Sequence, residues 1–261
     1  MSSQSGATDA MPRRTAMLGA GLFAFAAGAV PAASARDAAP SAAGHVVLLG
    51  DSVFDNAGYL AGRGPDVVGS LRARLPGGWR ATLLARGGSV AADVPGQLRR
   101  LPPDATHLVV SAGGNDAGRR EGVLAEPARS VAEGLAKIAS VRDRFAEDYR
   151  AMLDAVSARR LPVAVCTIYD PRFADPIRRR MAVVALAAFN DIITREAFAR
   201  SQALIDLRLI CGSDEDFAAA TGPSAQGSAK IAAAIAGWVA GDGSARRRSS
   251  EVFAGEAGGG R

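Results

Sequence analysis

The segment His45-Val46-Val47-Leu48-Leu49-Gly50-Asp51-Ser52 decides the fold. A short apolar run that ends in Gly-Asp-Ser predicts a buried strand followed by a turn into a helix. The serine hydroxyl then stands at a strand-to-helix corner, where backbone N–H groups and the positive end of the helix can act on a substrate. Gly, Asp and Ser also form ordinary turns, so the rest of the chain must decide between these two interpretations.

Four further apolar runs alternate along the chain with helical patterns. They are nearly continuous rather than alternating, which is typical of strands buried on both faces. Such alternation predicts an α/β fold with a doubly wound parallel sheet of five strands, which holds its ligands at the carboxyl ends of the strands. The five predicted strands span His45–Gly50, Trp79–Ala85, Thr106–Ala112, Leu161–Ile168 and Gln202–Leu209.

Three helices are predicted between and after these strands. The first spans Ser140–Arg160, with Ser140 as its N-cap and one apolar stripe, and Pro162 follows its end. The others span Ile177–Arg200 and Ser224–Ala240, the latter capped by Ser224.

Small and amide-bearing residues follow two more of the predicted strands, in Ala85-Arg86-Gly87-Gly88-Ser89 and in Ser111-Ala112-Gly113-Gly114-Asn115-Asp116. A last block, Gly222-Pro223-Ser224-Ala225-Gln226-Gly227, lies near the C-terminus. In order and spacing, these blocks and Gly50-Asp51-Ser52 resemble the four blocks of the SGNH/GDSL hydrolase family over about residues 44–239. The resemblance implies a three-layer α/β/α sandwich of the SGNH, flavodoxin-like type.

The resemblance also implies roles for individual residues. Ser52 would be the nucleophile, and the Ser52 N–H, the Gly88 N–H and the Asn115 amide would form the oxyanion hole. Asp51, Gly87 and Gly114 stand beside these residues and are expected to belong to the substrate-binding site; Asp51 is expected to hold the turn by accepting backbone N–H bonds. The sequence departs from the family in its last block. Where the family has Asp-x-x-His, this chain has Ala219 and Gly222.

No other residue takes over the missing histidine. The chain has two histidines, His45 and His107, and each begins a strand whose far end carries a block. At about 3.3 Å per residue, both imidazoles are expected roughly 15–20 Å from the site. Nearby carboxylates are poor bases for a hydroxyl unless burial raises their pKa. The acids Asp55, Asp116, Asp170, Asp214, Glu215 and Asp216 are therefore interpreted as caps and loop residues, with a divalent-cation site as the lesser alternative.

Three functions follow from this reasoning. The leading one is hydrolysis of small acyl or acetyl esters through Ser52, weak or unconventional because the triad is incomplete. The first alternative is a non-catalytic protein that keeps the pocket to bind an acyl, acetyl or carboxylate group. The second is a structural or interaction protein in which the blocks survive only as turns. No cofactor or metal is expected, since no Cys/His spacing resembles a zinc site.

Composition excludes some partners and leaves others open. The formal net charge is +5, and the only tight basic clusters are Arg178-Arg179-Arg180 and Arg246-Arg247-Arg248. A nucleic-acid binder would show a concentrated basic face and a reading motif, and neither is found. Cys166 and Cys211 are too few for a disulfide framework. If their strands are neighbours, a disulfide between them is geometrically allowed.

The N-terminus carries a targeting pattern. Arg13-Arg14 precede a weakly apolar stretch and Ala33-Ser34-Ala35, which predicts a signal peptide of the twin-arginine type over residues 1–35. The stretch is too short to span a bilayer comfortably, so stable membrane insertion is not expected. The signal pattern predicts export to the periplasm or medium. The alternatives are a disordered tail or an uncleaved anchor, and a cytoplasmic protein if there is no signal. The prediction is completed by a linker over 36–43, the hydrolase-like domain over 44–240, and a disordered Gly/Ser/Arg tail over 241–261.

Overall fold

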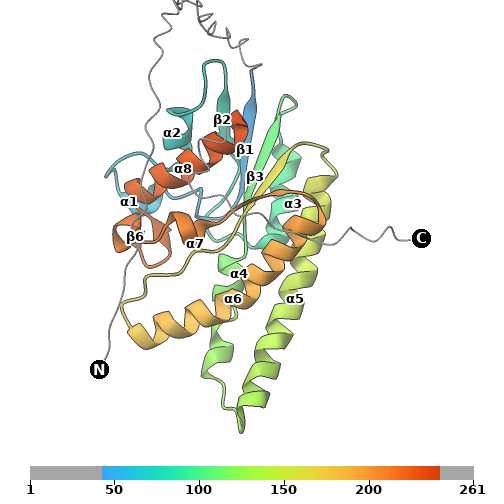
Figure 1. Cartoon of the computed structure of the whole chain (residues 1–261), viewed down its shortest axis with the longest axis vertical. Coiled ribbons are helices and arrows are strands. Elements are labelled where there is room, and N and C mark those ends of the chain that lie inside the picture. Colours follow the sequence, from blue (N-terminus) through green and yellow to red (C-terminus); the bar gives the residue numbers. More distant parts are fainter. Residues whose placement is uncertain (1–42, 242–261) are drawn as a thin grey trace, which may run out of the picture. The chain divides into compact units, whose positions relative to one another are not determined.

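A five-stranded parallel sheet forms the centre of the computed structural model, which describes residues 43–241 (Figure 1). The strand order is β2-β1-β3-β4-β5. This is a doubly wound order, in which the chain turns back between β1 and β3, so the carboxyl ends of these two strands define the switch point. The strands span β1 His45–Gly50, β2 Arg80–Leu83, β3 His107–Ser111, β4 Val163–Cys166 and β5 Ala203–Ile205.

Helices cover both faces of the sheet, which confirms the predicted three-layer sandwich. Figure 1 shows α2, α7 and α8 on one side of the strands and α3, α5 and α6 on the other. The first group spans Val67–Arg72, Leu207–Ile210 and Ala225–Ala240; the second spans Val94–Gln97, Val131–Ser157 and Pro176–Ala199.

Shorter elements sit in the connections. They are α1 Ala57–Leu60, α4 Gly114–Gly118, four 3₁₀ turns (η1 Ala91–Asp93, η2 Leu98–Arg100, η3 Glu121–Ala125, η4 Asp214–Asp216) and a hairpin of β6 Phe217–Ala219 and β7 Gly222–Pro223.

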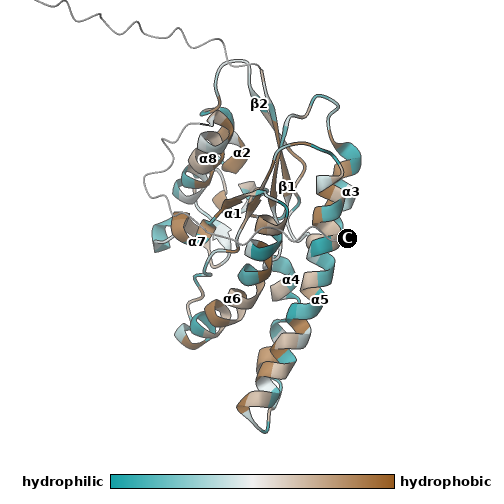
Figure 2. Ribbon diagram, turned by 45° about the vertical axis from the view of Figure 1, so that its right-hand side comes forward, coloured by the Kyte–Doolittle hydropathy of each residue, from teal (hydrophilic) through white to brown (hydrophobic). Residues whose placement is uncertain are grey.

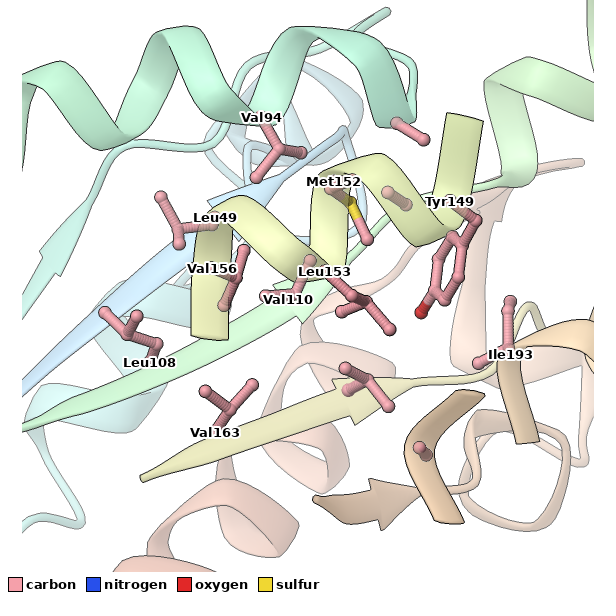
Figure 3. Close-up of a cluster of buried hydrophobic side chains, with 14 of the residues drawn as sticks. Leu49, Val94, Leu108, Val110, Tyr149, Met152, Leu153, Val156, Val163 and Ile193 are labelled. Carbon is pink, nitrogen blue, oxygen red and sulfur yellow. The ribbon is translucent and has the colours of Figure 1, made fainter. Parts of the chain in front are cut away.

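Alternate residues of the central strands face opposite layers. In β1, Val47 and Leu49 belong to the core under α3, α5 and α6, whereas Val46 and Leu48 belong to the core under α2 and α8. All four are fully buried. Figure 3 shows the first core, where Tyr149, Met152 and Leu153 of α5 lie over the strands. Burial on both sides explains why the strands are continuous apolar runs in the sequence.

Two predicted boundaries are wrong. The helix predicted from Ser140 begins ten residues earlier: Ser130 is its N-cap and accepts a hydrogen bond from the Glu133 N–H at 3.1 Å. Ser140 lies inside the helix and donates to the Ala136 carbonyl. The fifth strand was predicted to run to Leu209, but it ends at Ile205, because the Asp206 side chain caps the short helix α7.

The remaining predictions concern the last helix, the two cysteines, membrane-spanning helices and the two ends of the chain. Helix α8 begins after Ser224, whose hydroxyl accepts from the Gly227 N–H, as predicted. Cys166 and Cys211 are both buried and both unpaired. Among the described helices, none is both long enough and apolar enough to cross a bilayer. The predicted signal peptide and the tail beyond Gly241 lie outside the described residues, as does the linker except for its last residue.

Candidate active site

The Ser52 corner is held by its neighbours on β1 and β3. Gly50 has φ +117°, and a side chain there would overlap the Ser111 carbonyl, so the close approach of the two strands requires glycine. The Asp51 N–H donates to that carbonyl at 3.0 Å. The Asp51 carboxylate accepts from the Val53 N–H at 3.0 Å and from the Ser111 hydroxyl at 3.3 Å. Asp51 therefore holds the turn, as the sequence predicted.

Asp51 is a buried acid, only 3% exposed. Burial raises the pKa of Asp51 to about 7, against the opposing effect of the hydrogen bonds from Val53 and Ser111. A neutral or half-ionised carboxyl therefore lies directly behind Ser52 near neutral pH.

The loop after β2 brings two glycines to the same corner. The Gly87 N–H donates to the Asp55 carboxylate at 2.9 Å, and a Cβ at Gly87 would lie 3.9 Å from the Ser52 Cβ. Gly88 has φ +80°, and its carbonyl accepts from Arg119 at 2.9 Å. Gly87 therefore borders Ser52 directly, and Gly88 is the next residue along a loop that Asp55 and Arg119 fix.

Asn115 reaches the corner from the first turn of α4. Its side-chain Nδ2 donates one hydrogen to the Ser89 carbonyl at 2.8 Å, which leaves the second hydrogen free. A Cβ at the adjacent Gly114 would lie 3.8 Å from the Asp51 carboxylate. The ends of β1, β2 and β3 thus converge on one corner.

Asp116 belongs to the framework of this corner. Its carboxylate accepts from the Ala91 N–H at 3.1 Å, which ties α4 to the loop after β2. Burial raises the pKa of Asp116 to about 6. This contact supports the interpretation of Asp116 as a structural acid.

Backbone donors at this corner are unused. Within residues 43–241, the N–H groups of Ser52 and Gly88 donate no hydrogen bond, and the Ser52 hydroxyl has no hydrogen-bond partner. A ligand can reach these groups and accept hydrogen bonds from them, because Ser52 is half-buried and Gly88 is exposed. Free N–H groups beside a serine can bind an oxyanion.

A cavity of about 320 Å³ opens at this corner. Ser52, Asp51, Gly114 and Asn115 contribute to its lining, whereas Gly87 and Gly88 do not. The remaining lining is mostly apolar and comes from α4, η3, α5, the end of β4 and α6. Polar groups are thus gathered at the strand ends, and apolar groups line the space between the helices.

Tyr59 occupies the place where the family pattern has its histidine. A Cβ built on Gly222 would lie 2.5 Å from two carbons of the Tyr59 ring, so the ring packs directly on the glycine. Real side chains do not approach so closely, because carbon atoms pack at about 3.5–4.0 Å. Tyr59 also lines the cavity beside Ser52. The sequence analysis missed this residue, and no pattern in the sequence marks it.

Position 219 faces position 222 across the β6–β7 hairpin. Ala219 and Gly222 are register partners in this antiparallel pair. Side chains at such positions lie about 4.5–5.5 Å apart at their Cβ atoms. Side chains introduced at positions 219 and 222 would therefore lie next to each other.

The C-terminal block is anchored by two buried polar residues. Asp216 is fully buried and accepts from Lys230 at 2.7 Å and from Gln226 at 3.1 Å. Burial alone would raise the pKa of Asp216, but the hydrogen bonds from Lys230, Ser213 and Gln226 outweigh it and lower the pKa. Asp216 was interpreted as a cap or loop acid; it accepts from the Ser213 N–H at 3.1 Å in a capping box, and it also binds η4 to α8.

Asn56 is the second anchor and is also fully buried. Its Nδ2 donates to the Pro223 carbonyl at 3.2 Å and to the Ser228 hydroxyl at 2.8 Å, and its Oδ1 accepts from the Val67 N–H at 3.0 Å. One side chain therefore joins the Ser52 segment, α2, β7 and α8.

Both histidines lie at the amino end of the sheet. His45 begins β1 and contacts Thr82 at 2.7 Å and Asp104 at 3.2 Å. His107 begins β3, and its ring lies between Trp79 and Trp238, with centroids 5.2 and 5.4 Å away. Burial lowers the pKa of both imidazoles. Neither histidine forms a hydrogen bond with Ser52.

Acidic residues do not gather into a metal centre. Among residues 43–241, no three His, Cys, Asp or Glu side chains lie in an arrangement that could hold a metal ion. The arrangement described above is instead that of a serine at a strand-to-helix corner, with Asn115 lining the same cavity and Gly87 bordering the serine.

Comparison with known proteins identifies the family of this chain. The described fold is that of SGNH hydrolases, and residues 48–230 match the GDSL-like lipase/acylhydrolase family. The chain belongs to this family. A comparison with curated protein sequences finds no match.

Solved structures show the same fold at low identity. A phospholipase A1 from Streptomyces albidoflavus is 20% identical with a TM-score of 0.51, over 72% of this chain and 96% of that one. A carbohydrate acetylesterase from Sinorhizobium meliloti is 14% identical with a TM-score of 0.55, over 76% and 99%. A GDSL-like lipase from Bacteroides thetaiotaomicron is 14% identical with a TM-score of 0.52, over 76% and 88%.

Proposed function

We propose that the protein hydrolyses esters of small acylated molecules by acyl transfer to Ser52. The observation that carries this proposal is that Ser52 and Asn115 line one cavity while the Ser52 N–H and the second amide hydrogen of Asn115 have no partner within residues 43–241. We assign these two donors, together with the unused N–H of Gly88 on the adjoining loop, to an oxyanion hole. Donors held in place before the reaction stabilise the developing oxyanion, and losing one costs about 10²–10³ in rate. Asp51 and Gly114 belong to the wall of the proposed substrate site, and Gly87 borders Ser52 outside the cavity lining.

The reaction takes two steps. The Ser52 oxygen bonds to the carbonyl carbon, the alcohol leaves with a proton, and an acyl-serine remains. Water then attacks this intermediate and releases the acid and the free hydroxyl. No imidazole is in reach, so the Ser52 proton passes to water, and we expect hydrolysis to be slow. Where triad chemistry is removed, oxyanion stabilisation and binding still leave about 10³–10⁴-fold catalysis over water.

Labelling with a fluorophosphonate probe, followed by intact mass and peptide mapping, tests the nucleophile. We expect slow, stoichiometric labelling of Ser52 and none in Ser52→Ala. We also expect Asn115→Ala to lower kcat/KM for p-nitrophenyl acetate at least as much as Ser52→Ala does, because the donors carry what catalysis remains. An unlabelled Ser52, with the rate unchanged in both variants, contradicts the proposal.

Non-catalytic binding is the second candidate, and a specific observation favours it. Tyr59 fills the space of the missing base against Gly222, so the site lacks both the imidazole and the room for one. A binding protein would keep the donors and the cavity without turnover. Binding of an unreactive carbonyl compound in the absence of any Ser52 labelling would support this candidate over hydrolysis.

We also infer that the protein is exported and cleaved after Ala35. The inference depends on Arg13-Arg14, the weakly apolar stretch and Ala33-Ser34-Ala35. N-terminal sequencing of protein from the cell envelope or medium tests it. An intact Met1, or protein confined to the cytosol, contradicts it.

A further inference from the structure

The cavity extends well beyond the polar corner. On α5, Phe145 lies against Gly113 at the end of β3: a Cβ there would be 3.1 Å from its ring. Val141 and Ile138, four and seven residues earlier on the same helix, also line the cavity. At 1.5 Å per helical residue, the lining reaches about 10 Å past the strand end.

The lining contributed by helix α6 extends a similar distance past the strand ends. Asn190 marks the end of β4, since its side chain pairs with the Ile168 N–H and carbonyl at 2.8 Å each. Ala182, eight residues earlier on α6, still lines the cavity. The helical rise places it about 12 Å from the strand end. Both helices therefore wall one elongated space.

The wall of this extension carries no polar side chain until its outer end. Its members share aliphatic or aromatic character: Val123, Leu124, Ile138, Val141, Ala182, Ala185, Leu186 and Phe189. At the outer end, Arg178 bonds Glu121 at 2.6 and 2.9 Å and stacks on Phe173 at 3.9 Å. An apolar space with polar groups at its two ends fits a ligand with a polar head and a hydrocarbon chain.

We propose that this cavity binds an unbranched acyl chain of about eight to ten carbons, with its carbonyl at Ser52 and Asn115. The length of the apolar wall along α5 and α6 sets this number. An alkyl chain with 1.5 Å bonds advances about 1.25 Å per carbon, so 10–12 Å holds eight to ten. The assignment rests on the proposed function, which it narrows from small esters to medium-chain acyl compounds.

A chain-length series of p-nitrophenyl esters tests the assignment. Each buried methylene contributes about 0.8 kcal/mol, or about fourfold. We expect kcat/KM to rise at least a hundredfold from acetyl to octanoyl and to stop rising beyond about decanoyl. Ala182→Phe, and independently Ala185→Phe, should fill the space and lower the octanoyl-to-acetyl ratio at least tenfold. Ala187→Phe, on the exposed side of the same helix, should leave this ratio unchanged.

Binding separates this inference from the proposed function. 2-Decanone and 2-butanone carry the carbonyl but cannot be hydrolysed, and calorimetry can measure both on the full chain. We expect 2-decanone to bind at least tenfold more tightly, and Ala182→Phe to remove the difference. If no ester is hydrolysed but this preference holds, the hydrolase proposal fails and the acyl-chain site stands. If Ser52-dependent hydrolysis occurs without any chain-length preference, the acyl-chain site is overturned and the hydrolase proposal stands.

Discussion

Restoring the catalytic base requires the removal of Tyr59. We expect Gly222→His alone to give no gain in activity, since its Cβ would meet the Tyr59 ring at 2.5 Å. Overpacking of this kind costs about 1–3 kcal/mol of folding free energy. Tyr59→Ala with Gly222→His opens the space for an imidazole. Adding Ala219→Asp supplies the orienting carboxylate, because positions 219 and 222 are register partners.

The size of the expected gain follows from the chemistry. A positioned general base contributes about 10²–10⁴-fold. We therefore expect the triple variant to exceed Tyr59→Ala in kcat/KM on p-nitrophenyl acetate by at least a hundredfold, and the variant without Ala219→Asp to gain less. Because the base acts when neutral, the gain should grow as pH rises through about 6.5.

The control is Tyr59→Ala with Ala219→Asp, which has space and carboxylate but no imidazole and should show no gain. Ser52→Ala in the triple background should abolish the gain. The reasoning is refuted if Gly222→His alone, with Tyr59 in place, accelerates Ser52-dependent hydrolysis as much as the triple variant does. It is also refuted if unmodified protein hydrolyses the ester fast and Ser52→Ala stops it, since a base would then already be present.

Three further predictions concern stability and are measured by urea unfolding. Burial raises the pKa of Asp51 to about 7, so the folded chain keeps a proton that an unfolded aspartic acid releases near pH 3.9, and stability falls as pH rises between these values. Asp51→Asn should therefore gain a few kcal/mol at pH 8, and the gain should vanish at pH 4. Asn56→Ala should lose at least about 3 kcal/mol by leaving buried partners unpaired, whereas the adjacent Gly58→Ala should change little. Lys230→Met should cost about 2 kcal/mol at pH 7, since Lys230 is partly exposed, and the loss should shrink only at a pH below the ordinary range of aspartic acid, because the pKa of Asp216 is lowered.

The sheet could be predicted because each strand is buried on both faces. Val46 to Leu49 and Leu108 to Val110 are continuous apolar runs, and each is followed by the glycine and polar residues of a corner. The beginning of α5 could not be found from apolar periodicity. Its first turns extend past the sheet, where Val131 and Leu135 are exposed and the pattern no longer reflects a core (Figure 2). Ser130 and Glu133 form the Ser-x-x-Glu spacing that marks a helix start, and this signal was overlooked.

The contact between Tyr59 and Gly222 could not be predicted from the sequence alone. The missing Asp and His are visible as Ala219 and Gly222, because they fall inside a recognisable block. The side chain that fills the space comes from α1, more than 160 residues earlier. Only the three-dimensional packing of α1 against the β6–β7 hairpin connects the two positions. Introducing a histidine at position 222 and an aspartate at position 219 therefore also requires a change at position 59.

The shape of the Ser52 corner is not by itself evidence for catalysis. Gly50 is needed for the contact of β1 with β3, and its N–H and carbonyl both bond the buried Gln97 side chain, at 2.7 and 2.8 Å. Asp51 is needed for the turn, and Asn56 joins that segment to α8. These residues would be retained to keep the fold stable even in a protein that does no chemistry. Ser52 and the second amide hydrogen of Asn115 differ, because they form no such contact within residues 43–241. Their reactivity and ligand contacts, rather than the shape of the corner, therefore distinguish an ester hydrolase from an acyl-binding protein.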